Sequence, residues 1–171
     1  MYNNFMKKPL KSTFFLFLVI CGIGCSNNSD PISSQPNRNN NVNYTQIEWV
    51  STSEVYSDTP QVKPLSILYF TDDACSDGFL MEYNTFLDSQ VIVTLNISFN
   101  MARISTTNDS LISFHDSLMT GNQLFKLYNL VGVPSMLILD SEDRYFGRIQ
   151  AGYYPTDSFL TLLEYYKNKE Q

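Results

Sequence analysis

The chain has 171 residues, which is enough for one domain with its own hydrophobic core and an additional segment. Its 17 acidic side chains outnumber the 11 basic ones, and the formal net charge is −6. This excess of negative charge argues against nucleic acid as a partner, and against binding of the domain itself to anionic lipid headgroups.

Residues 1–24 are typical of a secretory signal peptide. Lys7, Lys8 and Lys11 form its basic part, and residues 14–20 form its apolar part. That apolar run is too short to span a bilayer as a permanent helix. Removal of the signal with its three lysines would change the net charge from −6 to −9.

Cys25 lies where the signal ends and is the predicted site of lipid attachment. The segment Gly22-Ile23-Gly24-Cys25 is similar to a bacterial lipobox, in which the cysteine becomes the lipidated first residue of the mature protein. Cys21 is a rival site, and a cleaved signal beside an incidental cysteine is a further alternative. Lipidation would attach the protein to a membrane through this anchor alone. It predicts a location in the cell envelope, facing the periplasm, at either the inner or the outer membrane.

Cys75 is the third cysteine of the chain. Cleavage before Cys25 removes Cys21, and lipidation consumes the sulfur of Cys25, so only Cys75 remains as a thiol. An exported compartment permits disulfides, yet a chain with one thiol cannot form one internally. A single exported thiol is either a reactive group or an intermolecular partner.

The first part of the mature chain is predicted to be a tether followed by a folded domain. Residues 25–43 are rich in Asn, Ser and Pro and have no periodic apolar pattern, which predicts a flexible tether. The domain is predicted to span residues 44–171. Within it, the alternation over residues 47–50 predicts a short strand, and residues 51–58 a short helix.

The middle of the domain contains the clearest strand. Residues 65–70 form a nearly continuous apolar run, which predicts a central strand buried on both faces. Apolar residues at spacings of three and four predict a helix over residues 75–89. Residues 99–104 are predicted to form a strand, and residues 105–121 a polar insertion or loop with one helical turn.

The last part of the domain alternates helix and hairpin. Residues 122–128 are predicted to be a helix, and residues 135–139 and 144–150 two strands joined by a turn. Pro155 suits the first turn of a terminal helix. The predicted order of elements is β-α-β-α-β-α-β-β-α.

This order and two motifs resemble the thioredoxin-like family. Cys75-Ser76-Asp77-Gly78 follows the apolar strand, where that family has Cys-x-x-Cys at the start of a helix. Val133-Pro134 precedes the next apolar strand, where the family has an X-Pro bond that is cis. The resemblance covers about residues 47–167. It implies an α/β fold of three layers, with a central mixed β-sheet, helices on both faces and no cofactor.

The resemblance places Cys75 at the nucleophilic position and Gly78 at the resolving position. A helix N-terminus favours the thiolate, whereas Asp72, Asp73 and Asp77 beside it disfavour the thiolate. Because Gly78 cannot resolve a mixed disulfide, the motif argues against a dithiol reductase. It predicts thiol and disulfide handling by a monothiol mechanism in which an external thiol resolves the intermediate.

Other positions depart from the family or agree with it. Ala74 replaces the usual aromatic residue before the cysteine, and Tyr69 replaces a buried acid that serves as a proton relay. The resemblance implies that the backbone of Val133, beside Pro134, pairs with an extended client. The expected partners are therefore exported proteins or peptides.

Two alternatives to a redox function remain open. Cys75 could be an ancestral residue on a redox-inactive module that binds peptides or proteins. The fold could also serve as a scaffold in an envelope assembly. In both cases Val133 and Pro134 could still shape a groove, or Pro134 could simply form a turn.

Three further patterns carry weaker functional predictions. The aspartates around Cys75 have no fourth ligand at a suitable spacing and suit helix capping, so no metal site is expected. His115, the only histidine, is interpreted as an exposed loop residue rather than as a base for Cys75. The repeated tripeptides Asp109-Ser110-Leu111 and Asp116-Ser117-Leu118 resemble an acceptor pattern for O-glycosylation of exported bacterial proteins.

Overall fold

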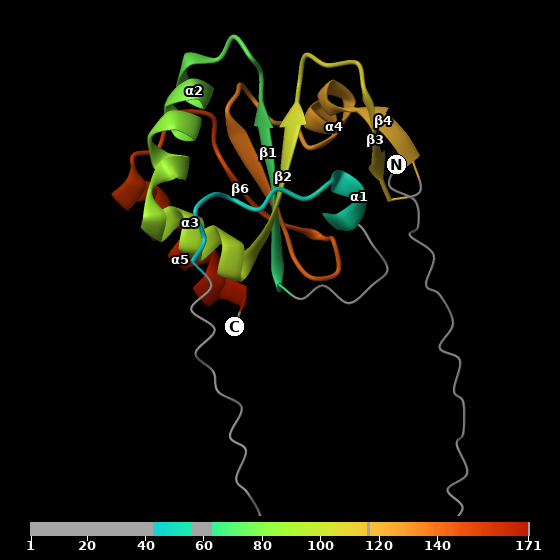
Figure 1. The fold of residues 1–171 in the computed structure, drawn as a ribbon. Coiled ribbons are helices and arrows are strands. Elements are labelled where there is room, and N and C mark those ends of the chain that lie inside the picture. The colour runs from blue at the N-terminus through green and yellow to red at the C-terminus, as the bar shows by residue number, and fades with distance from the viewer. Residues whose placement is uncertain (1–42, 56–62, 116, 171) are drawn as a thin grey trace, which may run out of the picture. The chain divides into compact units, whose positions relative to one another are not determined.

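The computed structural model describes residues 43–55, 63–115 and 117–170 (Figure 1). The chain divides into two units, residues 1–40 and 41–171, and every described residue belongs to the second. The predicted signal peptide lies outside the described residues, as do Cys21 and Cys25. The predicted tether does so too, apart from its last residue.

The described residues form helices, strands and one 3₁₀ turn. In chain order these are α1 (Thr52–Val55), β1 (Leu65–Thr71), α2 (Ser76–Tyr83), the 3₁₀ turn η1 (Thr85–Leu87), α3 (Ser89–Ser98), β2 (Phe99–Ser105), β3 (Leu111–Phe114), β4 (Ser117–Thr120), α4 (Gly121–Leu127), β5 (Ser135–Leu139), β6 (Tyr145–Ile149) and α5 (Thr156–Glu170).

The main sheet has the strand order β2-β1-β5-β6. Strand β2 is parallel to β1, whereas β5 is antiparallel to both β1 and β6, so the sheet is mixed. The parallel pair is joined by the α2–α3 segment, as a parallel connection requires a long crossover. Strands β3 and β4 form a separate two-stranded sheet.

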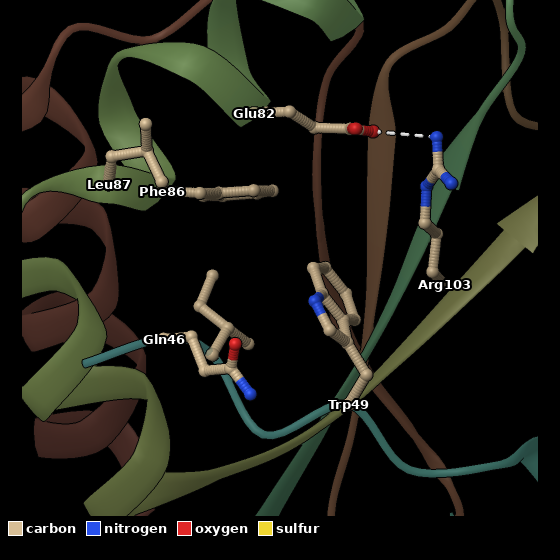
Figure 2. Close-up of a pocket in the computed structure, with 7 residues that line it drawn as sticks. Gln46, Trp49, Glu82, Phe86, Leu87 and Arg103 are labelled. Carbon is tan, nitrogen blue, oxygen red and sulfur yellow. Dashed lines mark ion pairs between the residues drawn. The ribbon is translucent and has the colours of Figure 1, made fainter. Parts of the chain in front are cut away.

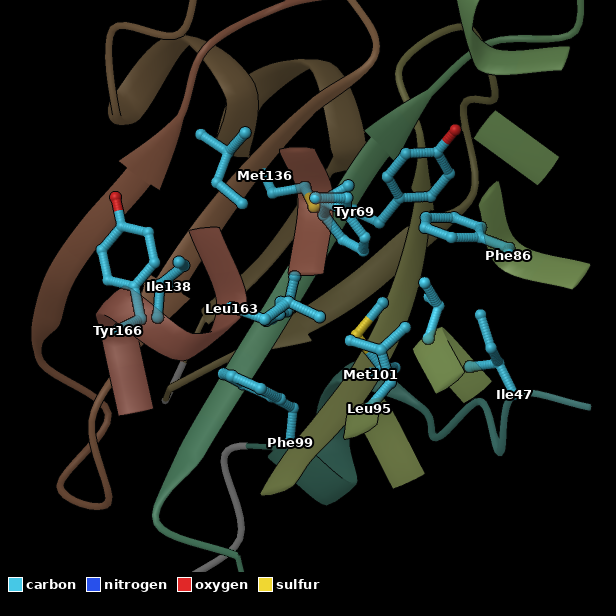
Figure 3. Close-up of a cluster of buried hydrophobic side chains, with 14 of the residues drawn as sticks. Ile47, Tyr69, Phe86, Leu95, Phe99, Met101, Met136, Ile138, Leu163 and Tyr166 are labelled. Carbon is cyan, nitrogen blue, oxygen red and sulfur yellow. The ribbon is translucent and has the colours of Figure 1, made fainter. Parts of the chain in front are cut away.

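Strand β1 lies at the centre of the core, and all seven of its residues are buried. Leu65, Ile67 and Tyr69 contribute to one apolar cluster, which includes side chains of α3 and α5 (Figure 3). Leu68 and Phe70 contribute to a second cluster, which includes side chains of α1, α4 and β3. The alternation along a strand explains this division. Figure 1 shows helices on both faces of the sheet, which confirms the predicted three-layer α/β fold.

The first predicted strand, residues 47–50, is wrong. Trp49 makes only an isolated parallel bridge with Met101, and the Val50 N–H donates to the Met101 carbonyl at 2.8 Å. The alternating pattern reports burial of Ile47 beside an exposed Glu48, but one bridge is too little for a strand.

The helix predicted over residues 75–89 is wrong in its extent. Helix α2 ends at Tyr83, and α3 begins after Asp88, whose side chain accepts hydrogen bonds from the N–H groups of Gln90 and Val91. This cap starts a helix in a segment for which the sequence pattern indicated no element. Val91, Ile92 and Leu95 then bury the apolar side of α3 in the first cluster.

The loop predicted over residues 105–121 is wrong in most of its length. It contains the hairpin of β3 and β4, in which Ile112 pairs with Met119. Phe114 is buried in the second apolar cluster, and this burial holds the hairpin on the domain. Within the described residues, no helix is both long and apolar enough to cross a membrane.

Candidate functional site

Cys75 lies at the N-terminus of α2, directly after the loop that follows β1. It is the N-cap residue, with φ −83° and ψ 110°, and its sulfur accepts a hydrogen bond from the Gly78 N–H at 3.3 Å. The thiol side chain thus occupies the capping position that Ser or Asp often takes. Cys75 is half-buried, so a reactant can reach it.

The Val133–Pro134 loop lies against the same sulfur. The peptide bond between these residues is cis, and the Cys75 Sγ is 3.2 Å from the Val133 carbonyl oxygen. Within the described residues, the Val133 N–H makes no hydrogen bond. The structure therefore brings together Cys75, Gly78, Val133 and Pro134, which the sequence places in two distant motifs.

The two hydrogen bonds of Cys75 favour opposite protonation states. The Gly78 N–H donates to the sulfur and stabilises a thiolate. The Val133 carbonyl can only accept, so its contact with the sulfur requires the thiol proton. A reactant that engages the Val133 carbonyl would therefore remove the contact that holds this proton.

Gly78 is buried beneath Cys75, and Thr71 fills the space beside it. A Cβ atom at position 78 would lie 2.6 Å from the Thr71 Oγ1, and 3.4 Å from the Cβ of Cys75. The second of these separations is close to the Cβ–Cβ distance of a disulfide. The first requires Thr71 to move. A side chain at the resolving position therefore requires Thr71 to shift, in addition to the missing sulfur.

Tyr69 lies beneath the site and is completely buried. Its hydroxyl donates a long hydrogen bond of 3.4 Å to the Gly78 carbonyl. Burial is the main cause that raises the pKa of Tyr69 to about 12, and the negative charge of Glu82 adds to the effect. This phenol stays protonated near neutral pH, so it cannot replace a buried carboxylic acid as a proton relay.

A pocket of about 160 Å³ opens beside Cys75, and we call it the Cys75 pocket. It is lined by Thr71, Asp72, Asp73, Cys75, Gly78, Phe79, Glu82 and Arg103. Arg103 on β2 forms an ion pair with Glu82 on α2, with 2.9 Å between Nη2 and Oε1. Sequence reasoning did not identify Thr71, Glu82 or Arg103 as site residues. No motif marks them, because their proximity depends on the register that sets Arg103 opposite Tyr69 in the parallel pair.

The weaker sequence patterns lie elsewhere or have structural roles. Asp72 accepts a hydrogen bond from the Ala74 N–H at 3.0 Å. In residues 43–55, 63–115 and 117–170, no group of three or more acidic, histidine or cysteine side chains could hold a metal ion. His115 lies at the hairpin tip, where its ring contacts Phe114, and it does not line the Cys75 pocket.

The two Asp-Ser-Leu tripeptides lie on or beside the β3–β4 hairpin. Ser110 and Ser117 are both exposed, and Ser117 is the first residue of β4. Asp116, which begins the second tripeptide, lies outside the described residues. The predicted glycosylation remains a prediction.

Comparison with known proteins establishes the fold. Neither the models of protein families nor the sequences of curated proteins match this chain. Among solved structures, a thioredoxin from Thermus thermophilus is 20% identical with a TM-score of 0.60, over 73% of this chain and 90% of that one. A structure described as a DsbH oxidoreductase is 14% identical with a TM-score of 0.58, over 83% of this chain and 95% of that one.

A thioredoxin-fold protein from Helicobacter pylori is also similar, at 18% identity and a TM-score of 0.58, over 72% of this chain and 83% of that one. The domain therefore has a thioredoxin-like fold. At these identities the likeness concerns the fold, so any activity has to be argued from the residues of the site.

We predict that Gly78→Cys is destabilised by about 1–3 kcal/mol, because its side chain collides with Thr71. Addition of Thr71→Ala should recover most of this loss, and should let the introduced thiol form a disulfide with Cys75 after mild oxidation. Chemical unfolding measures the first effect, and intact mass measures the loss of the thiol hydrogens. Thr71→Ala alone is the control. If Gly78→Cys alone is as stable as the wild type, the Thr71 side chain rotates away without cost, and the prediction is wrong.

We also predict that Tyr69 contributes a pH-dependent part of the stability. Its raised pKa means that the contribution is complete below the unfolded value of about 10, and is lost as pH rises through about 12. Between these values the free energy of unfolding should fall less steeply in Tyr69→Phe than in the wild type. Urea unfolding over this range checks it, with exposed Tyr83→Phe as the control. Equal slopes in wild type and Tyr69→Phe would contradict the assignment.

Proposed function

We propose that this domain is a thioredoxin-fold protein of the cell envelope that handles thiols and disulfides through Cys75 alone. The observation that carries the proposal is the position of the sulfur. It is half-buried at the N-terminus of α2, accepts the Gly78 N–H and lies beside the Val133 carbonyl. Cys75 is also the only free cysteine among the described residues.

The first step is attack by the Cys75 thiolate on one sulfur of a client disulfide. A bond forms between the Cys75 sulfur and that client sulfur, while the bond between the two client sulfurs breaks. The second client sulfur leaves as a thiolate and takes a proton from solvent. The helix N-terminus and the Gly78 N–H stabilise the attacking thiolate.

The second step needs a thiol from outside the chain, because position 78 has no sulfur. That thiol, as its thiolate, attacks the client sulfur of the mixed disulfide and releases Cys75 as a thiolate. The client keeps a disulfide to the external thiol. One disulfide is consumed and one is formed in each step, so no further oxidant or reductant is required.

The client in this proposal is an extended segment of an exported protein or peptide. The Val133 N–H is without a partner among the described residues and can donate to a client carbonyl. Val133 itself is half-buried, and Val131 in the same loop is 80% exposed. Pairing with a client would place its sulfur beside Cys75.

The central test is Cys75→Ser. The full-length wild-type protein should form an adduct with a small neutral disulfide such as 2,2′-dithiodipyridine, and fragment mass analysis should locate the adduct on Cys75. The variant should form none at this position and should lose the disulfide exchange of the described domain, because Cys75 is the only cysteine among the described residues. Exchange in Cys75→Ser that fragment mass analysis assigns to neither Cys21 nor Cys25 would overturn the proposal. A wild-type protein that forms no adduct would favour a redox-inactive binding module or scaffold.

The envelope location rests on the lipid anchor proposed at Cys25. We expect bacteria that grow with an alkyne-tagged fatty acid to label the wild-type protein, and to leave Cys25→Ser unlabelled. Cys21→Ser is the matched control and should be labelled like the wild type, because Cys21 leaves with the signal. Label that is lost in Cys21→Ser and kept in Cys25→Ser would place the anchor at Cys21. If neither the variants nor the wild type is labelled, the protein has no lipid anchor at either cysteine.

A further inference from the structure

A second pocket adjoins the Cys75 pocket along the side of α2, and we call it the aromatic pocket. It has a volume of about 360 Å³ and is lined by Gln46, Ile47, Trp49, Glu82, Phe86, Leu87 and Arg103. Glu82 and Arg103 line both pockets, so the ion pair between them forms a shared wall (Figure 2). The two pockets therefore follow one another from the N-terminus of α2 towards η1.

The aromatic pocket is built to receive an apolar group. The centroid of the Trp49 ring lies 5.9 Å from the centroid of the Phe86 ring and 6.1 Å from that of the Tyr69 ring. Phe86 is buried, but Trp49 is 40% exposed and Leu87 is 63% exposed. Figure 2 shows Phe86 and Trp49 turned towards the same space, with Arg103 beside the indole. An incoming side chain would cover apolar surface that water now contacts.

The polar wall of the aromatic pocket suits a neutral acceptor. Glu82 offsets the charge of Arg103 through an ion pair at its Nη2. The other guanidinium N–H groups make no hydrogen bond to the described residues. Because the charge is already paired, these donors favour the carbonyl of a peptide backbone over a free anion.

We propose that the aromatic pocket holds a large apolar side chain of the client segment that reacts with Cys75, while Arg103 donates to the backbone of that segment. This inference rests on the function proposed above and names the class of client. Cys75 and Glu82 are seven residues apart, which corresponds to about 10 Å along a helix. An extended chain covers that distance in about three residues. Because Glu82 forms the near wall of the aromatic pocket, the apolar side chain lies at least about three residues from the client cysteine.

The charges at the other end define the client further. Asp72 and Asp73 line the Cys75 pocket, and neither forms an ion pair with another described residue. Two unpaired carboxylates beside the reacting sulfur attract a basic side chain and repel an acidic one. The client segment thus carries a basic residue next to its cysteine and a large apolar residue at least about three positions away.

The test uses short peptides in which the single cysteine is joined to 2-thiopyridine. Attack by Cys75 on the peptide sulfur forms the mixed disulfide and releases the thiopyridine, which is followed by its absorbance. Phe is placed three or four residues before the cysteine, or three or four residues after it. At one of these positions the Phe peptide should react about tenfold faster than the same peptide with Ala. Replacement of a Lys next to the cysteine by Glu should slow the reaction severalfold.

Variants locate the effect. The ratio of the Phe-peptide rate to the Ala-peptide rate should fall towards one in Trp49→Ala and in Leu87→Ser. Leu127→Ser is the matched control, because Leu127 is 57% exposed on α4 and lines neither pocket. It should keep the wild-type ratio. Each ratio compares two peptides on one protein, so a general loss of thiol reactivity cancels.

Two failures can be told apart. If Cys75 forms no adduct even with 2,2′-dithiodipyridine, the proposed redox function fails. If Cys75 reacts with that small disulfide, but Phe and Ala peptides react at equal rates wherever Phe is placed before or after the cysteine, the redox function survives. The aromatic pocket is then not a client site. A preference for Phe that Leu87→Ser and Trp49→Ala leave intact would also overturn the inference.

Discussion

The burial of β1 on both faces fixes the rest of the structure. Each fully buried apolar side chain contributes about 1.5–3 kcal/mol, and β1 has no residue that faces solvent. Because β1 runs antiparallel to β5, its end meets the start of β5, where Phe70 pairs with Ser135. The loops that adjoin these two ends carry Cys75 and Pro134. One strand pairing therefore brings a sulfur and a cis-proline together across 59 positions of sequence.

The parts of the fold that could be predicted are those whose sequence pattern follows directly from burial. The apolar run of β1, the β5–β6 hairpin and α5 have this property. Helix α3 does not, because its β-branched residues suit a strand equally well, and the Asp88 cap and packing decide its form. The β3–β4 hairpin could not be predicted either, since each of its strands has only four residues. Its packing on the domain depends on the burial of Phe114.

The site divides in the same way. Cys75, Gly78, Val133 and Pro134 could be placed because two short motifs carry them, and the structure sets them side by side. Thr71, Glu82 and Arg103 could not be placed, because their proximity depends on strand register and on the side of α2 that meets β2. No local pattern encodes such a meeting. The residues proposed to react can therefore be predicted from short motifs. The residues proposed to select a client cannot, because they meet only through the packing of β2 against α2.

The contact between Gly78 and Thr71 has an evolutionary consequence. A chain that once lost its second cysteine could regain it by one substitution only if the space had stayed open. Here Thr71 Oγ1 occupies the position that the first side-chain atom would need. On the expected destabilisation of Gly78→Cys, a lineage carrying this pair passes through a less stable intermediate or changes Thr71 first. Packing then makes the loss of the second cysteine harder to reverse by a single mutation.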